Sequence, residues 1–239
     1  MDRLVPVPRS VRSLHAVFTR DAVEPVADVA APPAVLLRRF GASDDALAAV
    51  ERRPYARVFA VDTAPELAAG ELVAARQSAL QLAVDHDGIV IDLAVPRVIR
   101  AGEVDPAVAS HWIALDLDDT HLLSRGLQSF GLPELRIETG EPPPLDAVQP
   151  EAARTDPAPA DPPRTGMVLA VAMGLAQRLI TEWPANDPVG PAAVTLHDIA
   201  LGFADPEPAP REPALDLMID YVDGLLDVTF VDDPATLFS

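Results

Sequence analysis

The sequence predicts an α/β fold of α+β sandwich-like character, in which a mixed β-sheet is covered by helices. Three observations favour this class. Short apolar runs of strand length alternate with stretches of helical periodicity, and an apolar helix followed by an Asp-Gly hairpin closes the chain. In addition, 49% of the 239 residues are hydrophobic but only 5% are aromatic, so we expect a core of Ala, Val, Leu and Ile.

The first elements form a strand, helix, strand unit. Residues 13–19 (SLHAVFT) and 56–62 (ARVFAVD) are rich in β-branched and aromatic residues and are bounded by charge or proline, as strands tend to be. Between them, Ser43 is placed to cap a helix over residues 44–52. The first turn of that helix carries two aspartates, which the helix dipole favours.

A longer helix is predicted over residues 63–87. Thr63 and Glu66 form a capping-box pattern at its start, and Gly88 stands where the helix would end. Its apolar positions recur at helical spacing and are Leu72, Val73, Ala79, Leu80, Ala83 and Val84.

Three further strands follow. Residues 89–94 (IVIDLA) predict a buried strand, residues 97–100 extend it or pair with it, and residues 111–117 (HWIALDL) predict another. Since helices interleave with these strands, we expect one sheet covered on at least one face.

Two Pro-rich stretches divide the chain. Residues 141–164 retain no apolar periodicity and read as a linker, while residues 204–213 read as a surface loop. The linker separates a sheet-and-helix lobe, residues 1–140, from a helix-plus-hairpin lobe, residues 165–239. The sequence leaves open whether the second lobe packs on the first as one body.

The last lobe contains a helix and a hairpin. Residues 166–183 are apolar nearly all round and predict a buried helix that ends before Pro184. Residues 215–222 and 225–231 flank an Asp-Gly pair at 223–224, which suits a two-residue turn because both positions need positive φ. Apolar and polar residues alternate along both strands, so one face of the hairpin is expected to contact solvent.

The chain is strongly acidic. It carries 37 acidic residues against 18 basic ones, all of them Arg, for a net charge of -19. This charge repels nucleic-acid phosphates and anionic lipids, so neither nucleic acid nor membrane partners are expected. The lysine-free composition is typical of a GC-rich bacterial genome, with adaptation to high salt as the alternative.

Other absences narrow the classes of protein. There is no Cys, hence no disulfide, thiolate metal site or thiol nucleophile. The first 12 residues lack the apolar region of a signal peptide, and the apolar run at 167–180 is too short for a bilayer span. We therefore expect a soluble cytoplasmic protein.

One segment has a catalytic pattern. Asp116, Asp118, Asp119 and Thr120 close an apolar strand (WIALDLDDT) and resemble the first motif of haloacid-dehalogenase-type phosphatases. The resemblance implies that Asp116 attacks phosphorus and Asp118 acts as acid and base beside Mg²⁺, at the end of a parallel strand. However, the motif stands in mid-chain, the family's Lys is absent, and few strands follow. The competing interpretation is a strand-to-helix turn in which Asp119 or Thr120 caps the next helix.

A second segment resembles families of uncharacterised bacterial proteins. Residues 124–135 (SRGLQSFGLPEL) fit their pattern T-x-G-(apolar)-x-x-F-G-x-P-(D/E)-L, with Ser124 in place of Thr. In those families a helix and a short apolar strand precede it, which here correspond to residues 74–92, ending Gly-Ile-Val-Ile-Asp. The resemblance implies a domain of unknown function and no established active site.

Architecture accounts for that segment without a ligand. Phe130 anchors the segment to the sheet, Gly131 ends a helix in the left-handed conformation, and Pro133 prevents its restart. In the functional alternative, Arg125 and Glu134 are binding residues at the rim of a pocket beside the sheet.

The sequence predicts no metal site and no cofactor. The five histidines are dispersed, and no HxH or HExxH pair occurs. The glycine-rich loops of nucleotide-binding proteins and the G-x-S-x-G elbow of hydrolases are also missing.

Three hypotheses for function remain. A non-catalytic interaction or accessory protein that meets a basic protein partner with an acidic surface is favoured over an enzyme. The alternatives are a small-ligand-binding domain and a divergent Mg-dependent phosphatase that uses Asp116 and Asp118. An apolar pocket rimmed by Arg125 or Glu134 favours ligand binding, whereas a flat acidic face favours a protein partner. No oligomeric state is predicted.

Overall fold

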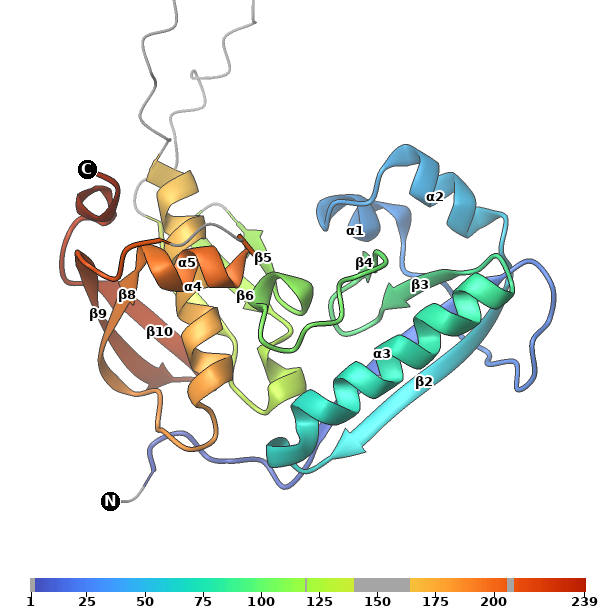
Figure 1. The fold of residues 1–239 in the computed structure, drawn as a ribbon, viewed down its shortest axis with the longest axis horizontal. Coiled ribbons are helices and arrows are strands. Elements are labelled where there is room, and N and C mark those ends of the chain that lie inside the picture. Colours follow the sequence, from blue (N-terminus) through green and yellow to red (C-terminus); the bar gives the residue numbers. More distant parts are fainter. Residues whose placement is uncertain (1–2, 119, 140–163, 206–208) are drawn as a thin grey trace, which may run out of the picture.

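A computed structural model describes residues 3–118, 120–139, 164–205 and 209–239 (Figure 1). The described chain combines helices with mixed and antiparallel strands, which confirms the predicted fold class. The predicted linker and part of the second Pro-rich stretch lie outside these residues.

The elements follow in chain order. The strands are β1 (Val11–Thr19), β2 (Tyr55–Thr63), β3 (Ile89–Asp92), β4 (Arg97–Val98), β5 (Ala114–Leu117), β6 (His121–Arg125), β7 (Leu135–Glu138), β8 (Gly190–Thr195), β9 (Ala214–Val222) and β10 (Leu225–Phe230). The α-helices are α1 (Ala34–Arg39), α2 (Asp44–Glu51), α3 (Ala68–Asp85), α4 (Arg164–Glu182) and α5 (Leu196–Gly202). Short 3₁₀ helices are η1 (Pro65–Leu67), η2 (Ala109–His111), η3 (Leu127–Phe130) and η6 (Pro234–Phe238).

The strands form two sheets, so the expectation of a single sheet is wrong. The four-stranded sheet has the order β2-β1-β3-β4, and both neighbours of β1 run antiparallel to it. Helix α3 packs on one face of this sheet, while α1 and α2 pack on the other. The buried residues that join α3 to its face are Val17, Ala79, Ala83, Val90 and Ile99.

Local capping decides where the first helices begin. The Oγ of Ser43 accepts a hydrogen bond from the Ala46 N–H at 3.2 Å, which confirms the predicted cap of α2. The predicted start of the long helix at Thr63 is wrong, because Thr63 pairs with Val11 as the last residue of β2. Helix α3 starts only at Ala68, after η1, and has no side-chain cap.

The buried face of α3 contains a charged residue. The helix buries Leu72, Arg76, Ala79 and Ala83. Val84, which the apolar spacing assigned to this face, is 78% exposed. An arginine therefore completes the stripe that packs against the sheet.

The end of α3 depends on two adjacent residues. The helix ends at Asp85, and the residue in the left-handed conformation after it is Asp87 (φ 48°), not the glycine at position 88. Gly88 is needed for close packing, since a Cβ there would lie 3.0 Å from Val17 Cγ1 and 3.1 Å from the Phe18 carbonyl oxygen.

The six-stranded sheet joins distant parts of the chain. Its order is β5-β6-β7-β10-β9-β8, and β7 pairs with β10 in parallel, with Ile137 beside Val228. The hairpin predicted for the lobe at 165–239 therefore continues a sheet that begins before residue 140.

The elements of this sheet match the sequence in part. Positive φ at Asp223 (53°) and Gly224 (82°) confirms the β9–β10 turn. The strand expected over 111–117 begins only at Ala114, because η2 occupies the preceding turn. The sequence did not predict β8 or α5.

In the described part of the chain, helices cover one face of the six-stranded sheet. Helix α4 lies across that face with α5 beside it (Figure 1), and η6 packs against α4. The predicted buried helix over 166–183 is confirmed by α4, whose residues 167–168 and 171–177 are buried. No helix in the described ranges is long and apolar enough to cross a membrane.

Candidate functional site

The segment at 116–120 forms the tip of the β5–β6 hairpin. The Oδ1 of Asp118 accepts hydrogen bonds from the N–H groups of Thr120 (3.0 Å) and His121 (2.7 Å). These bonds hold the pKa of Asp118 below its usual range. The expectation that Asp119 or Thr120 caps a following helix is wrong, because the chain continues as β6; Asp119 itself lies outside the described residues.

Asp116 is held between two arginines. Its Oδ1 accepts from Arg39 Nε at 2.5 Å and its Oδ2 from Arg125 Nε at 3.2 Å, and the side chain is only 7% exposed. A nucleophilic role for Asp116 would require both ion pairs to open. Within the described residues, no three His, Asp or Glu side chains converge as a metal-binding group.

The two predicted rim residues are separated by their contacts. Glu134 turns into its own loop, where it accepts from the Ser124 hydroxyl (2.5 Å) and the Gly126 N–H (2.8 Å). Arg125 points instead to Asp116. Glu134 therefore stabilises its loop, and Arg125 lies on the surface of the sheet, so the two residues do not form the rim of one pocket.

The rest of the 124–135 segment agrees with the interpretation that Phe130 anchors it and that Gly131 is left-handed. Phe130 is buried and stacks edge-on against Trp112, with 5.9 Å between ring centroids. Gly131 has φ 85°. Gly126 has φ 115° and lies so close to the Trp112 carbonyl that a Cβ would approach it to 2.4 Å. Two glycines and one aromatic ring therefore shape this loop.

The uncovered side of the six-stranded sheet is here called the open face. In the described residues, the contacts to it come from the end of α1 at the β5 edge, where Arg39 binds Asp116 and the Phe40 ring lies 5.9 Å from Arg125 Cζ. Strand alternation assigns side chains to it, among them the polar Asp116, His121, Arg125, Arg136, Glu138, Asp216, Asp220, Asp227 and Thr229 and the apolar Leu123, Met218, Val222 and Leu225. The register aligns a row across five strands, which reads Asp116, Leu123, Arg136, Asp227 and Asp220.

An ion pair fixes the centre of this face. Arg136 Nε and Nη2 donate to the two carboxylate oxygens of Asp227, each at 2.5 Å. Hydrogen bonding from Arg136 holds the pKa of Asp227 below its ordinary value. A shallow hollow of about 420 Å³ surrounds the pair and reaches Glu138 and Asp220.

Three carboxylates on the open face remain uncompensated. In the described part of the chain, no cationic side chain contacts Glu138, Asp216 or Asp220. Asp220 also lies directly opposite Asp227, a like-charge pairing that is unfavourable between strands. The open face therefore has an ion pair at its centre, and the residues around that pair carry excess negative charge.

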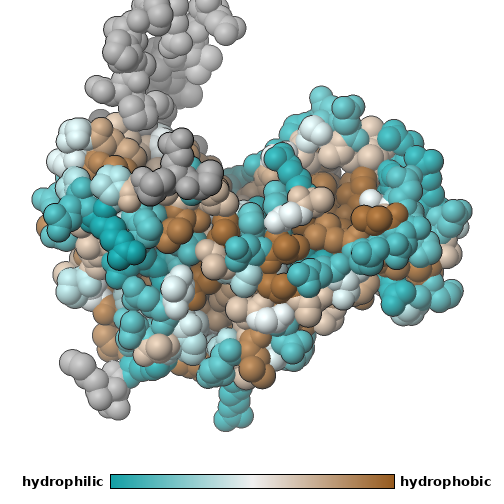
Figure 2. All heavy atoms as spheres, viewed as in Figure 1, coloured by the Kyte–Doolittle hydropathy of each residue, from teal (hydrophilic) through white to brown (hydrophobic). Residues whose placement is uncertain are grey.

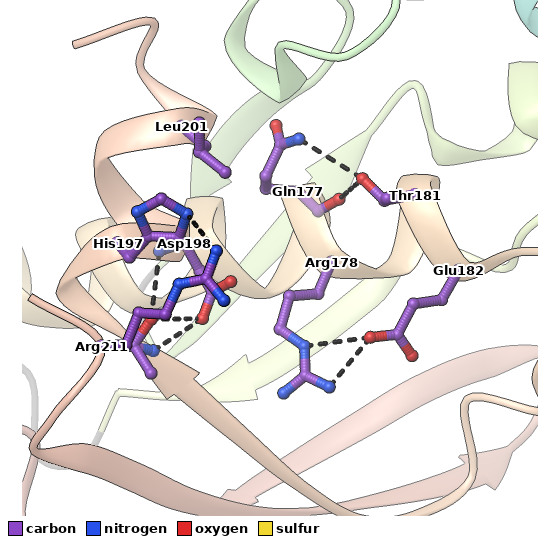
Figure 3. A pocket seen from close by; sticks show the side chains of 9 residues that line it. Gln177, Arg178, Thr181, Glu182, His197, Asp198, Leu201 and Arg211 are labelled. Carbon is purple, nitrogen blue, oxygen red and sulfur yellow. Dashed lines mark hydrogen bonds and ion pairs between the residues drawn. The ribbon is translucent and has the colours of Figure 1, made fainter. Parts of the chain in front are cut away.

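A separate pocket of about 340 Å³ lies between α4 and α5 (Figure 3). Arg178 donates to Glu182 at 2.9 Å, and Asp198 accepts the backbone N–H that begins the α5 cap at 2.9 Å. Arg211 reaches over His197, with 3.3 Å between Nη2 and Nε2. Because most of its polar groups bind one another, the pocket offers few free partners to a ligand. Neither predicted rim residue lines it.

The most buried charges belong to the other sheet. Arg76 is fully buried, donates to Asp92 Oδ2 at 2.8 Å and to His15 Nε2 at 3.1 Å, and stacks 3.4 Å from the Trp112 ring centroid. It also donates to the carbonyls of residues 103 and 111, which ties α3 to the loop before β5. Burial lowers the pKa of Arg76 to about 10 and that of His15 to about 4. This network is structural, because Arg76 joins Asp92, His15 and two backbone carbonyls, although the buried Nδ1 of His15 has no hydrogen-bond partner among the described residues.

Several residues of these clusters escaped sequence reasoning. Arg76 could have been found, since it falls four residues after Leu72 and three before Ala79 on the apolar stripe. Arg136 and Asp227 lie 91 positions apart, and nothing local links them.

Comparison with known proteins adds no information on the fold or on these sites. No protein-family model matches the chain, and neither the curated proteins nor the solved structures gave a match.

Proposed function

We propose that this protein is a non-catalytic interaction protein and that its open face binds a basic surface of a protein partner. The observation that carries the proposal is a six-stranded sheet with helices on one face and uncompensated carboxylates on the other. In this proposal the protein acts in the cytoplasm, which suits a chain without cysteine.

The geometry suits a protein partner better than a small molecule. A sheet face is broad, and its hollow is shallow and polar, whereas small-ligand sites are concave and mostly apolar. The Arg136–Asp227 pair is already formed, so little side-chain ordering remains for binding. Glu138, Asp216 and Asp220 then offer carboxylates to Lys or Arg of the partner.

From the resemblance of the 124–135 segment, we also propose that the chain is related to families of uncharacterised bacterial proteins, and the loop contacts give the shared residues a structural role. Ser124 and Glu134 hydrogen-bond each other, and Phe130 and Gly131 shape the turn between them. In this interpretation the shared pattern preserves the loop that carries β6 into β7.

The test compares captures from an extract of the host. The triple variant Glu138→Gln, Asp216→Asn, Asp220→Asn removes the free charges, and its control is Asp44→Asn, Asp45→Asn, Glu51→Gln on α2. We expect at least one captured protein with a basic surface to fall by tenfold or more with the first variant alone. Equal losses with both variants, or none with either, contradict the proposal.

A second measurement addresses the phosphatase alternative. The wild type and Asp116→Asn are assayed with Mg²⁺ against a panel of phosphomonoesters. We expect no turnover that depends on Asp116. Turnover that the substitution abolishes would replace the interaction proposal with an enzymatic one.

A further inference from the structure

The four-stranded sheet has a long edge strand. Strand β2 pairs along all of its residues with β1 and stands at the edge of its sheet. On its outer side, Ala27 donates a hydrogen bond to the Ala56 carbonyl at 2.7 Å, and Arg57 donates to the Glu24 carbonyl at 2.9 Å. These contacts cover only the start of the strand.

The remainder of this edge has unpaired backbone groups. Because the Ala56 carbonyl points outward, strand alternation also turns the N–H and C=O groups of Val58, Ala60 and Asp62 outward. No described residue forms a hydrogen bond with these backbone groups. Val58 and Ala60 are neither charged nor proline, so two common protections of an edge strand are missing there.

A groove of about 520 Å³ runs beside this edge, between β2 and α3, which lie side by side in Figure 1. The residues that line it are Arg57, Phe59, Gln77, Ser78, Gln81, Leu82 and Asp85. Phe59 and Leu82 give it an apolar floor, and the helix supplies a polar rim. On the molecular face that carries α3, Figure 2 shows hydrophobic patches bordered by hydrophilic residues.

The charges at the groove favour a basic occupant. Arg57 is already stacked over the Phe59 ring at 5.5 Å and donates to the Glu24 carbonyl. Asp85 contacts only the Gln81 amide, at 2.9 Å, and Glu71 on the same face of α3 has no cationic partner among the described residues. Asp85 therefore leaves a carboxylate without a cationic partner at one end of the groove, and Glu71 leaves another beyond the groove lining, towards the start of α3.

We infer that an extended segment of a partner protein adds to the β2 edge as a fifth strand, with apolar side chains in the groove and a basic residue at each end. Glu71 and Asp85 are 14 positions apart, about 21 Å along a helix. Six residue steps of an extended strand span about 20 Å. A heptapeptide with basic ends and two apolar residues between them on the same face matches that spacing.

A second copy of this chain fits the edge less well. Two chains of net charge -19 repel each other, and paired β2 strands would bring the acids of one α3 towards those of the other. The inference does not rest on the proposed function, because it concerns the other sheet and other side chains.

The probe is the synthetic peptide Arg-Thr-Val-Thr-Val-Thr-Arg. Binding to the full chain is measured by fluorescence anisotropy of the labelled peptide, and amide hydrogen exchange locates it. We expect saturable binding and slower exchange at Val58, Ala60 and Asp62. A peptide with N-methyl groups on the residues that would pair with β2 is expected not to bind, because it cannot form the ladder.

Variants then separate the backbone from the charges. Ala60→Pro removes the outward N–H and is expected to abolish binding, whereas Ala60→Ser keeps the N–H and is expected to bind as the wild type does. The double variant Glu71→Gln, Asp85→Asn is expected to weaken binding by about tenfold. The peptide with Glu in place of both Arg residues is expected to bind at least as weakly to the wild type.

Three outcomes would overturn the inference. These are no binding of the basic peptide, unchanged affinity for the N-methylated peptide, and protection that falls outside residues 55–63. A fourth is protection of the β2 edge that rises with protein concentration without peptide, since that would assign the edge to a second copy of the chain. None of these results depends on the open face, whose variants leave β2 intact.

Discussion

The two sheets differ in how helices cover them, and their charged residues differ accordingly. The four-stranded sheet lies between helices on both faces, and its Arg76–Asp92 ion pair is fully enclosed. The described helices cover only one face of the six-stranded sheet, and its Arg136–Asp227 pair is about one-third exposed. The first pair holds elements together, while the second organises a surface. Matched substitutions in the two sheets test this difference.

The largest effect is expected for Arg76→Met. It leaves Asp92 buried without its cation, so we expect the free energy of unfolding to fall by about 3–5 kcal/mol, measured by urea denaturation. The matched variant Arg136→Met, on the open face, is expected to stay close to the wild type. A similar loss of unfolding free energy in both variants would mean that the Arg136–Asp227 pair also stabilises the fold.

The second effect is a dependence on pH that belongs to the enclosed sheet. Burial lowers the pKa of His15 from 6.5 to about 4, although nearby Asp92 opposes this and Arg76 and Arg97 add to it. The native imidazole is therefore neutral, as its acceptance of a hydrogen bond from Arg76 requires. The unfolded chain binds a proton below pH 6.5, so stability is fully present above that pH and is lost as the pH falls towards 4, by about 3 kcal/mol.

The variant His15→Gln tests the origin of that loss, since its amide oxygen still accepts from Arg76 but does not titrate. Unfolding of both proteins is measured at half-unit intervals from pH 7 to 4.5. We expect the free energy of unfolding of the wild type to fall relative to that of the variant as the pH falls. A constant difference would assign the acid sensitivity to other groups.

An intermediate effect is expected where a loop adjoins the open face. Glu134→Ala leaves the Gly126 N–H and the Ser124 hydroxyl without their acceptor, which is expected to cost about 2 kcal/mol of stability. Glu138→Ala, four residues later on the open face, serves as the control and is expected to change little. Thermal unfolding of the two variants distinguishes a structural glutamate from a surface one.

The smallest effect is expected for Asp220→Asn. Asp220 is exposed and lies opposite Asp227, so removal of its charge is expected to shift stability by less than about 0.5 kcal/mol, in the stabilising direction. A clear loss of stability would show that Asp220 has a structural partner and weaken the case for a binding role.

Local chemistry explains what the sequence could predict. The Asp223-Gly224 turn, the Ser43 cap, the strands around residues 13–19 and 56–62, and the buried helix α4 each depend on neighbours within a few positions. Long-range pairing explains most of what it could not predict. Strand β8 is held by its pairing with β9, which residues 190–195 do not reveal by themselves. Helix α5 begins at a capping box of Thr195 and Asp198, a local signal that sequence reasoning missed.

The candidate sites were harder to predict than the fold. Asp116 was singled out for its motif, but its partner Arg39 lies 77 positions away, and this contact determines what the carboxylate does. Glu134 was singled out as a rim residue, whereas its hydrogen bonds turn it inward. Whether a side chain serves a site depends on its partners, which the spacing along the chain does not reveal.

The parallel pairing of β7 with β10 has a consequence for the order of synthesis. Every strand of the four-stranded sheet lies within residues 11–98, so a ribosome delivers all of them before it makes β5. The central ladder of the other sheet joins residues 135–137 to 226–228, and it forms only when residues 226–228 have emerged. During that interval β7 exposes an unpaired edge, and until residue 182 has been made β5, β6 and β7 also lack the cover of α4. The nascent chain is therefore most open to wrong pairing, or to a chaperone, between about residues 140 and 226.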